Sequence, residues 1–284
     1  MKKDDFFKQV QDTIFEMART GGKRLSVLLA ALLKKMETTG GVLKSSTKNN
    51  RLLSEILKTI RLFYKNQAST LSKFIKEQLT ELVEITALEL GKQAKKVIDK
   101  VKYLDTLLTD FGFSSSSAVN ATTPLGNLLK DDIVSKTIIA TVSKAIREGS
   151  IIKDVIKKVI SFFLPDKGLG IVESQIYHKG GFNLFQQQDR ILSDAMAQDL
   201  GLNFAVYAGT VKDNTRDFCR QRVNKIYTKE EIKSWANLQF KGRVNPYNPL
   251  TDCGSINCRH HYNWVSEETA LRLAATRGGI NSYR

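Results

Sequence analysis

A long stretch without proline, from Leu53 to Leu108, places apolar side chains at steps of three and four residues. This spacing, about 3.5 residues per repeat, lines one face of an α-helix, and the first proline of the chain lies only at position 124. A helix longer than about 25 residues is typical of a rod or a coiled-coil-like hairpin. The polar residues 65–67 and Gly91 are the places where such a rod could divide into shorter helices.

The first third of the chain reads as a helical arm. Residues 4–37 have helical periodicity that Gly21–Gly22 interrupts, and residues 38–50 are rich in Gly, Ser, Thr and Asn, which predicts a loop. We therefore assign residues 1–112 to a long N-terminal helical arm or hairpin, and the Ser-rich stretch 113–124 to a linker.

The rest of the chain changes character at about residue 200. Residues 125–164 and 184–199 have helical patterns, with Gly149 and Pro165 as expected ends, and together they form a predicted helical part, 125–200. Short β-like runs follow at 204–208 and within 257–265. The sequence thus predicts a mainly α fold with a small α+β C-terminal module at 201–284.

The net charge of +15 favours a polyanionic partner, either nucleic acid, an acidic protein face or an anionic membrane surface. A solvated lysine-rich surface without a partner is the alternative. Aromatic residues are few among the N-terminal lysines, and helix-turn-helix or zinc-finger spacing is absent, so sequence-specific reading of DNA has no support. No apolar run reaches the 18 or more residues of a membrane span, and we expect use without secretion.

Two motifs near the C-terminus carry the most specific signal. The run Asp213-Asn214-Thr215-Arg216-Asp217-Phe218-Cys219 follows a predicted strand, and Cys258-Arg259-His260 follows Cys253 at the end of a variable stretch. A strand, then Asp-x-Thr-Arg-x-x-Cys, then Cys-Arg-His resembles the C-terminal domain of Mu F-like phage head-morphogenesis proteins. Asn224, where that family usually has Gly, and the absence of a Pro-x-His-Pro segment depart from its pattern.

The resemblance implies a minor head protein of a tailed bacteriophage. Such a protein would act in virion assembly rather than as an enzyme. It would bind the portal protein or the major capsid protein and contact packaged double-stranded DNA without reading its sequence. Its place would be the capsid interior or the portal, after synthesis in the host cytoplasm, with homo-oligomers formed through the helical arm as a further expectation.

The motif residues also have a structural interpretation. Asp213 and Thr215 are typical residues before a helix, so a helix is expected at 214–223. Arg216 and Arg259 have forked guanidinium groups suited to paired contacts with a carboxylate, and Asp213, Asp217 and Asp252 are the possible partners. The motif would then hold a small, poorly cored module in shape.

The cysteines and histidines allow three interpretations. A structural zinc ion could be held by Cys219, Cys253, Cys258 and His260, with His261 as an alternative ligand. The three cysteines could instead be buried thiols, or two of them could form a disulfide in a released virion. No other cofactor is indicated.

A catalytic interpretation of the same residues is a nucleophilic pair of Cys258 with His260. Alternate residues of a strand share a face, so His260 and not His261 would lie beside Cys258. Asp252 or Glu267 would have to orient the imidazole. A zinc-dependent nucleic-acid enzyme built on the same cluster is the rival function, although no acidic residue lies at a recognisable spacing to serve as its general base. A connector protein or an injected virion protein is the other alternative.

Overall fold

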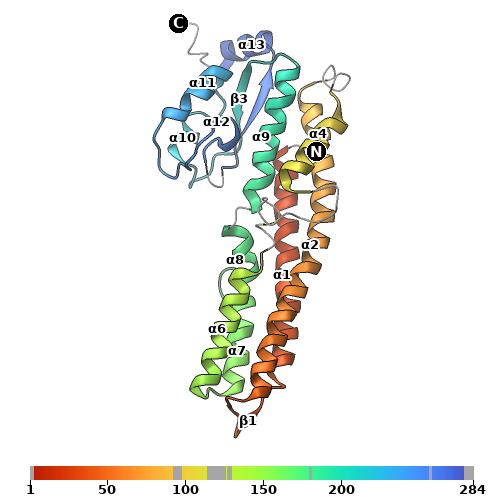
Figure 1. The fold of residues 1–284 in the computed structure, drawn as a ribbon. Coiled ribbons are helices and arrows are strands. Elements are labelled where there is room, and N and C mark those ends of the chain that lie inside the picture. The colour runs from red at the N-terminus through yellow and green to blue at the C-terminus, as the bar shows by residue number, and fades with distance from the viewer. Residues whose placement is uncertain are drawn as a thin grey trace. The chain divides into compact units, whose positions relative to one another are not determined.

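A computed structural model describes residues 3–91, 98–113, 126, 130–178, 181–255 and 258–277. The chain is mostly helical with one small C-terminal sheet, which confirms the predicted fold class (Figure 1). It forms two compact units. The knob unit comprises Met1–Gln9, Lys76–Phe113 and Gly180–Arg284, and the helical unit comprises Val10–Ile75 and Ser114–Lys179. These units cut across the bounds we expected from sequence, because the two longest helices contribute to both.

Helix α1 (Lys3–Leu33) runs through the Gly21–Gly22 pair that was expected to interrupt it. The reason is close packing. A side-chain carbon at Gly21 would lie 3.1 Å from both Gln67 Nε2 and Phe63 Cζ, so glycine lets two long helices approach each other. Their packing stabilises the helix more than two glycines weaken it.

Helix α2 (Thr47–Glu89) is continuous across the polar residues 65–67. It ends just before Gly91, whose φ of 102° is in the left-handed region that favours glycine. Helix α4 (Lys100–Phe111) follows, with the Asp99 carboxylate accepting hydrogen bonds from the backbone N–H groups of Val101 and Lys102. The predicted rod therefore divides at Gly91, and residues 92–97 lie outside the described part of the chain.

Residues 38–50 are more ordered than the loop that their composition predicts. Strands β1 (Thr38–Thr39) and β2 (Val42–Leu43) form a short antiparallel hairpin, and α2 begins at Thr47. The buried Asn49 side chain holds the hairpin's base, since its amide donates to the carbonyls of Glu37 and Lys44 and its carbonyl accepts from Glu37 N–H. Side-chain hydrogen bonds thus add to the apolar contacts of the buried Leu43.

Helices α6 (Asp132–Glu148), α7 (Ile152–Phe163) and α8 (Ile171–His178) complete the helical unit. Gly149 ends α6 with a φ of 62°, and α7 stops before Pro165, both as predicted. Helix α8 was not predicted. The expected linker 113–124 lies outside the described residues except for Phe113.

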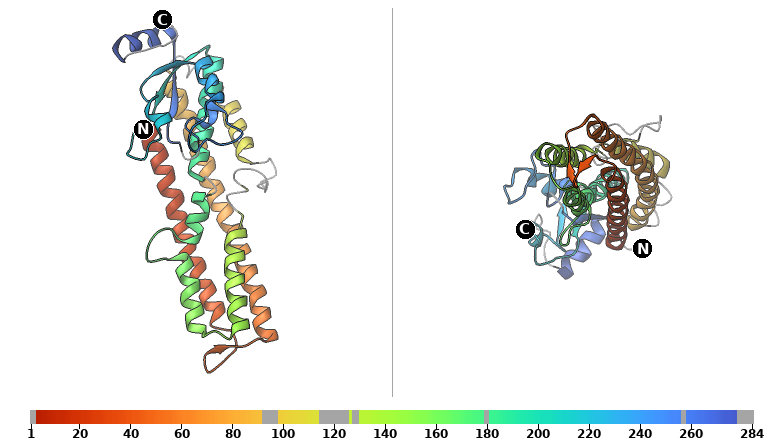
Figure 2. Two further views of the ribbon diagram at one scale, coloured as in Figure 1. Left: turned by 90° about the vertical axis from the view of Figure 1, so that its left-hand side faces the viewer. Right: turned by 90° about the horizontal axis from the view of Figure 1, so that it is seen from below.

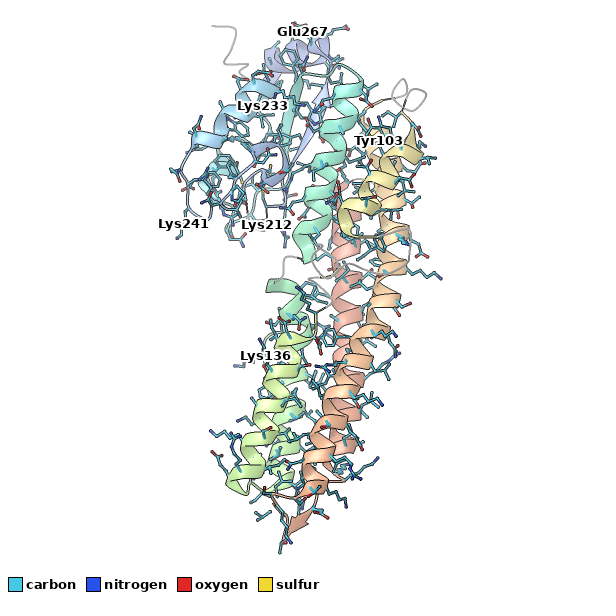
Figure 3. All side chains as sticks on the ribbon, in the orientation of Figure 1. Tyr103, Lys136, Lys212, Lys233, Lys241 and Glu267 are labelled. Atoms are coloured by element: carbon cyan, nitrogen blue, oxygen red, sulfur yellow. The ribbon has the colours of Figure 1, made fainter. Side chains whose placement is uncertain are left out.

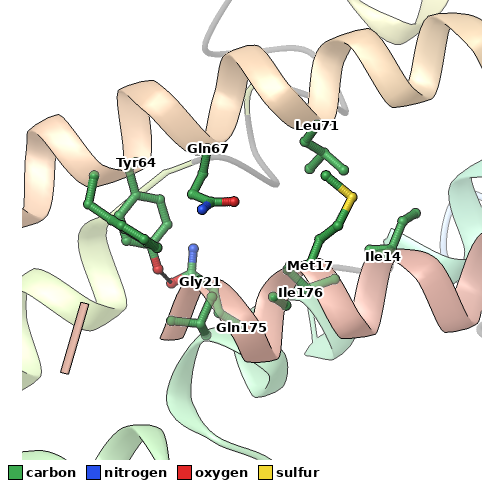
Figure 4. Close-up of a pocket in the computed structure, with 11 residues that line it drawn as sticks. Ile14, Met17, Gly21, Tyr64, Gln67, Leu71, Gln175 and Ile176 are labelled. Carbon is green, nitrogen blue, oxygen red and sulfur yellow. Dashed lines mark hydrogen bonds between the residues drawn. The ribbon is translucent and has the colours of Figure 1, made fainter. Parts of the chain in front are cut away.

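A small apolar cavity lies inside the helical unit, among α1, α2 and α8 (Figure 4). Its volume is about 30 Å³, and Tyr64 Oη donates to Gln175 Oε1 at 3.2 Å at its edge. Binding pockets for small molecules are about ten times larger. The cavity is therefore a packing defect rather than a candidate binding site.

The knob unit is built on a three-stranded antiparallel sheet with strand order β4-β3-β5. Strand β3 (Phe204–Ala208) is central and confirms the predicted run, β4 (Ile226–Thr228) pairs with one edge, and β5 (His261–Val265) pairs with the other. Figure 1 shows α9 (Gly181–Asp199) beside this sheet. The remaining elements are the short helices α10 (Asp217–Arg220), α11 (Lys229–Ser234) and α12 (Pro249–Asp252), a 3-10 turn (Trp235–Asn237) and α13 (Glu267–Arg277).

One core of the knob unit is rich in aromatic residues. Its buried members include Tyr207, Phe218, Trp235, Tyr262 and Trp264, together with all three cysteines. Because both tryptophans of the chain lie in this core, tryptophan fluorescence reports on the knob unit alone. Among the helices that the structure describes, none is long and apolar enough to cross a membrane.

Candidate metal and structural site

The two sequence motifs meet in the core of the knob unit. Cys219 lies on the short helix α10, while Cys258 and His260 lie just before β5. The Sγ atoms of Cys219 and Cys258 are 3.8 Å apart, and Cys258 Sγ is 3.5 Å from Nδ1 of His260. The three ligand atoms lie within 4.8 Å of one another, so this group could hold a metal ion.

The cluster is sealed from solvent. Cys219 and Cys258 are each 2% exposed and His260 is 5% exposed. The Tyr207 ring stacks on the His260 imidazole with centroids 5.3 Å apart, and its hydroxyl donates to Cys219 Sγ at 3.3 Å. The Nε2 atom of His260 is buried and has no hydrogen-bond partner among the described residues.

The pKa values of the three thiols shift in different directions. Hydrogen bonds from Cys219 and Cys253 lower the pKa of Cys258 well below its usual value against the effect of burial, and His260 and Arg190 contribute in the same direction. The backbone N–H of Gly254 also donates to Cys258 Sγ, at 3.1 Å. The hydrogen bond to Cys258 and burial raise the pKa of Cys219, and burial raises that of Cys253. Cys258 is therefore the thiol most ready to lose its proton.

Two glycines make room for the cluster. A side-chain carbon at Gly254 would lie 2.1 Å from Cys219 Sγ and 2.9 Å from Cys258 Sγ. One at Gly209 would lie 2.8 Å from Cδ2 of His260, and Gly209 also has a φ of 137°. No larger residue fits either position without displacing the ligand side chains.

The side chain that organises the site is one that sequence reasoning missed. Arg190, on α9, is 0% exposed. Its guanidinium donates to the backbone carbonyls of Thr251 at 2.7 Å, Cys258 at 2.6 Å and His260 at 3.0 Å. It thus fixes the backbone of the segment that carries two of the three candidate ligands.

A sequence signal for this region does exist. Asp189 occupies the apolar stripe of α9, at helical spacing from Phe185, Leu192 and Met196, and a charged residue in such a stripe indicates a buried polar contact. Nothing in the sequence, however, identifies the neighbouring Arg190 as buried.

Asp189 belongs to a second buried cluster, which holds the N-terminus of α1. Lys3 Nζ lies 2.7 Å from both Asp189 Oδ1 and Glu89 Oε2. Although burial alone would lower the pKa of Lys3, these two carboxylates raise it above its usual value. Lys3 is only 3% exposed and Asp189 is fully buried, so each of these two charges depends on the other for neutralisation.

The predicted helix cap at Asp213 and Thr215 is wrong. The helix here spans only Asp217–Arg220, and its first cap residue, Arg216, makes no side-chain cap bond. The Thr215 hydroxyl instead accepts from Lys212 N–H at 2.7 Å, and Arg220 Nη2 donates to the Asp213 carbonyl. These contacts close a turn in the backbone, which prevents a helix from starting at 214.

The two motif arginines differ in role. Arg216 Nη1 donates to the Gly254 carbonyl at 3.1 Å, so it links the first motif to the second. Arg259 is exposed, and no described carboxylate lies within ion-pair distance of it, so its predicted pairing is wrong. The Asp252 carboxylate is bound by Asn248 N–H and by the Gln187 amide rather than by an arginine.

The remaining predicted site residues are placed as follows. Cys253 is fully buried in the same core as Cys258, but it is not part of the three-residue ligand group. All three cysteines are free thiols, which differs from the disulfide interpretation. His261 begins β5 and does not join the ligand group, so it is not the alternative ligand; Cys258 and His260 lie before the strand, and strand alternation is therefore not the reason for their proximity. Glu267 is exposed at the start of α13.

The comparisons with known proteins give no further guide to the site. No family model matches the chain, and neither the curated proteins nor the solved structures contain a match to it.

Proposed function

We propose that the chain is a structural assembly protein of a tailed-phage head, of the Mu F-like minor head kind. The observation that carries the proposal is the convergence of two short motifs, about forty residues apart in sequence, on one sealed cluster. Arg216 and Cys219 from the first motif meet Gly254, Cys258 and His260 from the second. Residues arranged in this way hold a small module in shape.

In this proposal the helical unit makes the contacts specific to the particle. Its partners are the portal protein or the major capsid protein, and double-stranded DNA is contacted through phosphates without sequence reading. The protein is made in the host cytoplasm and stays in the capsid interior or at the portal. Mass spectrometry of purified particles, before and after DNA ejection, tests this location. Absence of the chain from particles of the phage that encodes it refutes the proposal.

We propose zinc as the metal for the cluster. With Zn–S distances of about 2.3 Å and Zn–N distances of about 2.0–2.1 Å, a tetrahedral centre separates two sulfurs by about 3.8 Å and a sulfur from a nitrogen by about 3.5 Å. The corresponding distances are 3.8 Å for Cys219 to Cys258 and 3.5 Å for Cys258 to His260. The lowered pKa of Cys258 also favours the thiolate that zinc requires.

Structural zinc sites usually have four protein ligands. Cys253 is our candidate for the fourth, since it is fully buried in the same core; its Sγ lies outside the three-residue group and would have to move toward the ion. When bound, zinc would cross-link α10 to the segment before β5. Elemental analysis of the purified protein is the test. We expect about one zinc per chain, and a content below about 0.3 per chain excludes a structural site.

An enzymatic role for the Cys258–His260 pair is the less favoured function. Its support is the 3.5 Å contact and the lowered pKa of Cys258. A substrate would have to reach side chains that are 2% and 5% exposed, and the Asp252 carboxylate, one of the two candidate orienting groups, is bound elsewhere. Replacing Cys258 by Ser separates the two functions. We expect loss of folding or of incorporation into particles, whereas an enzyme would stay folded and lose only turnover.

A further inference from the structure

Nearly half of the net charge of the chain is concentrated at one end of the helical unit. We define the hairpin end as residues 34–51 and 144–158, which are the β1–β2 hairpin with its flanks and the turn between α6 and α7. These segments hold ten basic and three acidic side chains, a net charge of +7 out of +15 for the whole chain. Neither segment contains an aromatic residue.

Backbone hydrogen bonds join the two segments, although about a hundred residues separate them in sequence. Leu43 N–H donates to the Ser150 carbonyl at 3.0 Å, and Ile152 N–H donates to the Gly41 carbonyl at 3.0 Å. Figure 2 shows the hairpin next to the ends of the surrounding helices. The charge concentration is thus produced by the fold, because in the sequence the second segment lies in a region of almost balanced charge.

The charges of the hairpin end are available to a partner. All ten basic side chains are exposed. Within the described residues, two of the ten form ion pairs, Lys48 with Glu37 at 3.9 Å and Lys144 with Glu148 at 3.7 Å. The other eight form no ion pair there: Lys34, Lys35, Lys44, Arg51, Arg147, Lys153, Lys157 and Lys158. Such a density of uncompensated charge attracts a polyanion and weakens the fold slightly by self-repulsion.

We propose that the hairpin end binds the phosphates of double-stranded DNA. Single-stranded nucleic acid is bound on stacking aromatic rings, and proteins that sit at a membrane interface use Trp and Tyr there, but the hairpin end has neither. Lysine and arginine on a rigid backbone suffice for sequence-independent contacts with a duplex. The inference rests on the proposed function, since packaged DNA is the duplex that a head protein meets.

The experiment compares two variants of equal net charge. The hairpin-end variant carries Lys34→Gln, Lys35→Gln, Lys44→Gln and Lys153→Gln. The control variant replaces four exposed lysines of the knob unit by Gln: Lys212, Lys225, Lys233 and Lys241. Figure 3 labels three of these on the knob unit. Circular dichroism checks that both variants keep the helical content of the parent protein.

Fluorescence anisotropy with a labelled duplex of arbitrary sequence measures binding between about 50 and about 200 mM salt. We expect the hairpin-end variant to bind at least about tenfold more weakly than the parent protein. The slope of log K against log salt should fall by about 0.9 for each phosphate that the variant no longer neutralises. The control variant should weaken binding by less than about threefold.

If both variants lost the same amount of duplex affinity, binding would depend on the net charge of the whole chain, and the proposal would be overturned. It would also be overturned if neither variant lost affinity. The proposal would also be overturned if the hairpin-end variant still bound duplex DNA but no longer bound anionic vesicles or an acidic protein. That result would assign the surface to the partner whose binding was lost. The proposed function can fail separately. If purified particles lack the protein but the hairpin-end variant still loses duplex binding, the surface stands and the head assignment falls.

Discussion

Replacing Arg190 by Ala would leave the backbone carbonyls of Thr251, Cys258 and His260 without their donor in the core of the knob unit. Each of the three accepts a hydrogen bond from the guanidinium at 2.6–3.0 Å, and Arg190 is 0% exposed. A hydrogen bond to a charged group contributes about 1.5–3 kcal/mol, but water entering the cavity would satisfy some of the carbonyls. We therefore expect a loss of about 3–5 kcal/mol in the free energy of unfolding.

Urea unfolding followed by tryptophan fluorescence isolates this effect, because Trp235 and Trp264 both lie in the knob core. With a slope of about 2 kcal/mol per molar urea, the midpoint should fall by about 2 M. Arg259→Ala is the matched control, since Arg259 is an exposed residue of the same segment, and its effect should stay within about 0.5 kcal/mol. All measurements use the same zinc concentration. Equal midpoints for the two variants would refute the assignment of Arg190 as the organising side chain.

Three further outcomes are expected. Gly254→Ala should displace Cys219 Sγ, because the new carbon would lie 2.1 Å from it. The thiols should then react faster with a thiol reagent, and an unchanged rate would contradict the close packing of Gly254 against Cys219. Lys3→Met should lower the free energy of unfolding of the knob unit by about 3–5 kcal/mol in the same urea assay, because Asp189 would stay buried without its partner. The exposed Lys8→Met is its control, and equal losses in the two variants would argue against the buried pair. Chelation of a zinc-loaded protein should lower the fluorescence midpoint while the helical signal of the rest persists, and an unshifted midpoint would exclude a structural metal.

Local patterns predicted the structure correctly where one residue or a short run determines the backbone conformation. Gly149 ends α6 with a left-handed φ, and the apolar run 204–208 is the central strand of the sheet. The division of the rod at Gly91 was one of two alternatives from sequence, and the left-handed φ of that residue explains why the chain breaks there. These features depend on the conformational range of a few neighbouring residues.

Local patterns failed where other contacts outweigh them. The Gly21–Gly22 pair reads as an interruption, yet the helix continues because those positions admit a neighbouring helix. Asp213 and Thr215 read as a helix start, yet side-chain bonds to backbone groups close a turn there. At Gly21 the competing interaction comes from a helix that is distant in sequence, whereas at Thr215 it comes from residues three to seven positions apart.

Residue order alone was enough to predict the helical arm, the small C-terminal sheet and the set of cysteines and histidines that could supply a metal site. Three features emerge only from the folded chain: Cys219, Cys258 and His260 come together as a candidate ligand group, Arg190 rather than Arg259 binds the backbone beside them, and nearly half of the net charge lies at the hairpin end. Helical periodicity and the conformational range of glycine depend on neighbours along the chain, so the order of residues is enough to predict their effects. Burial, ligand distance and charge density depend on which remote segments come together, and no local pattern specifies that.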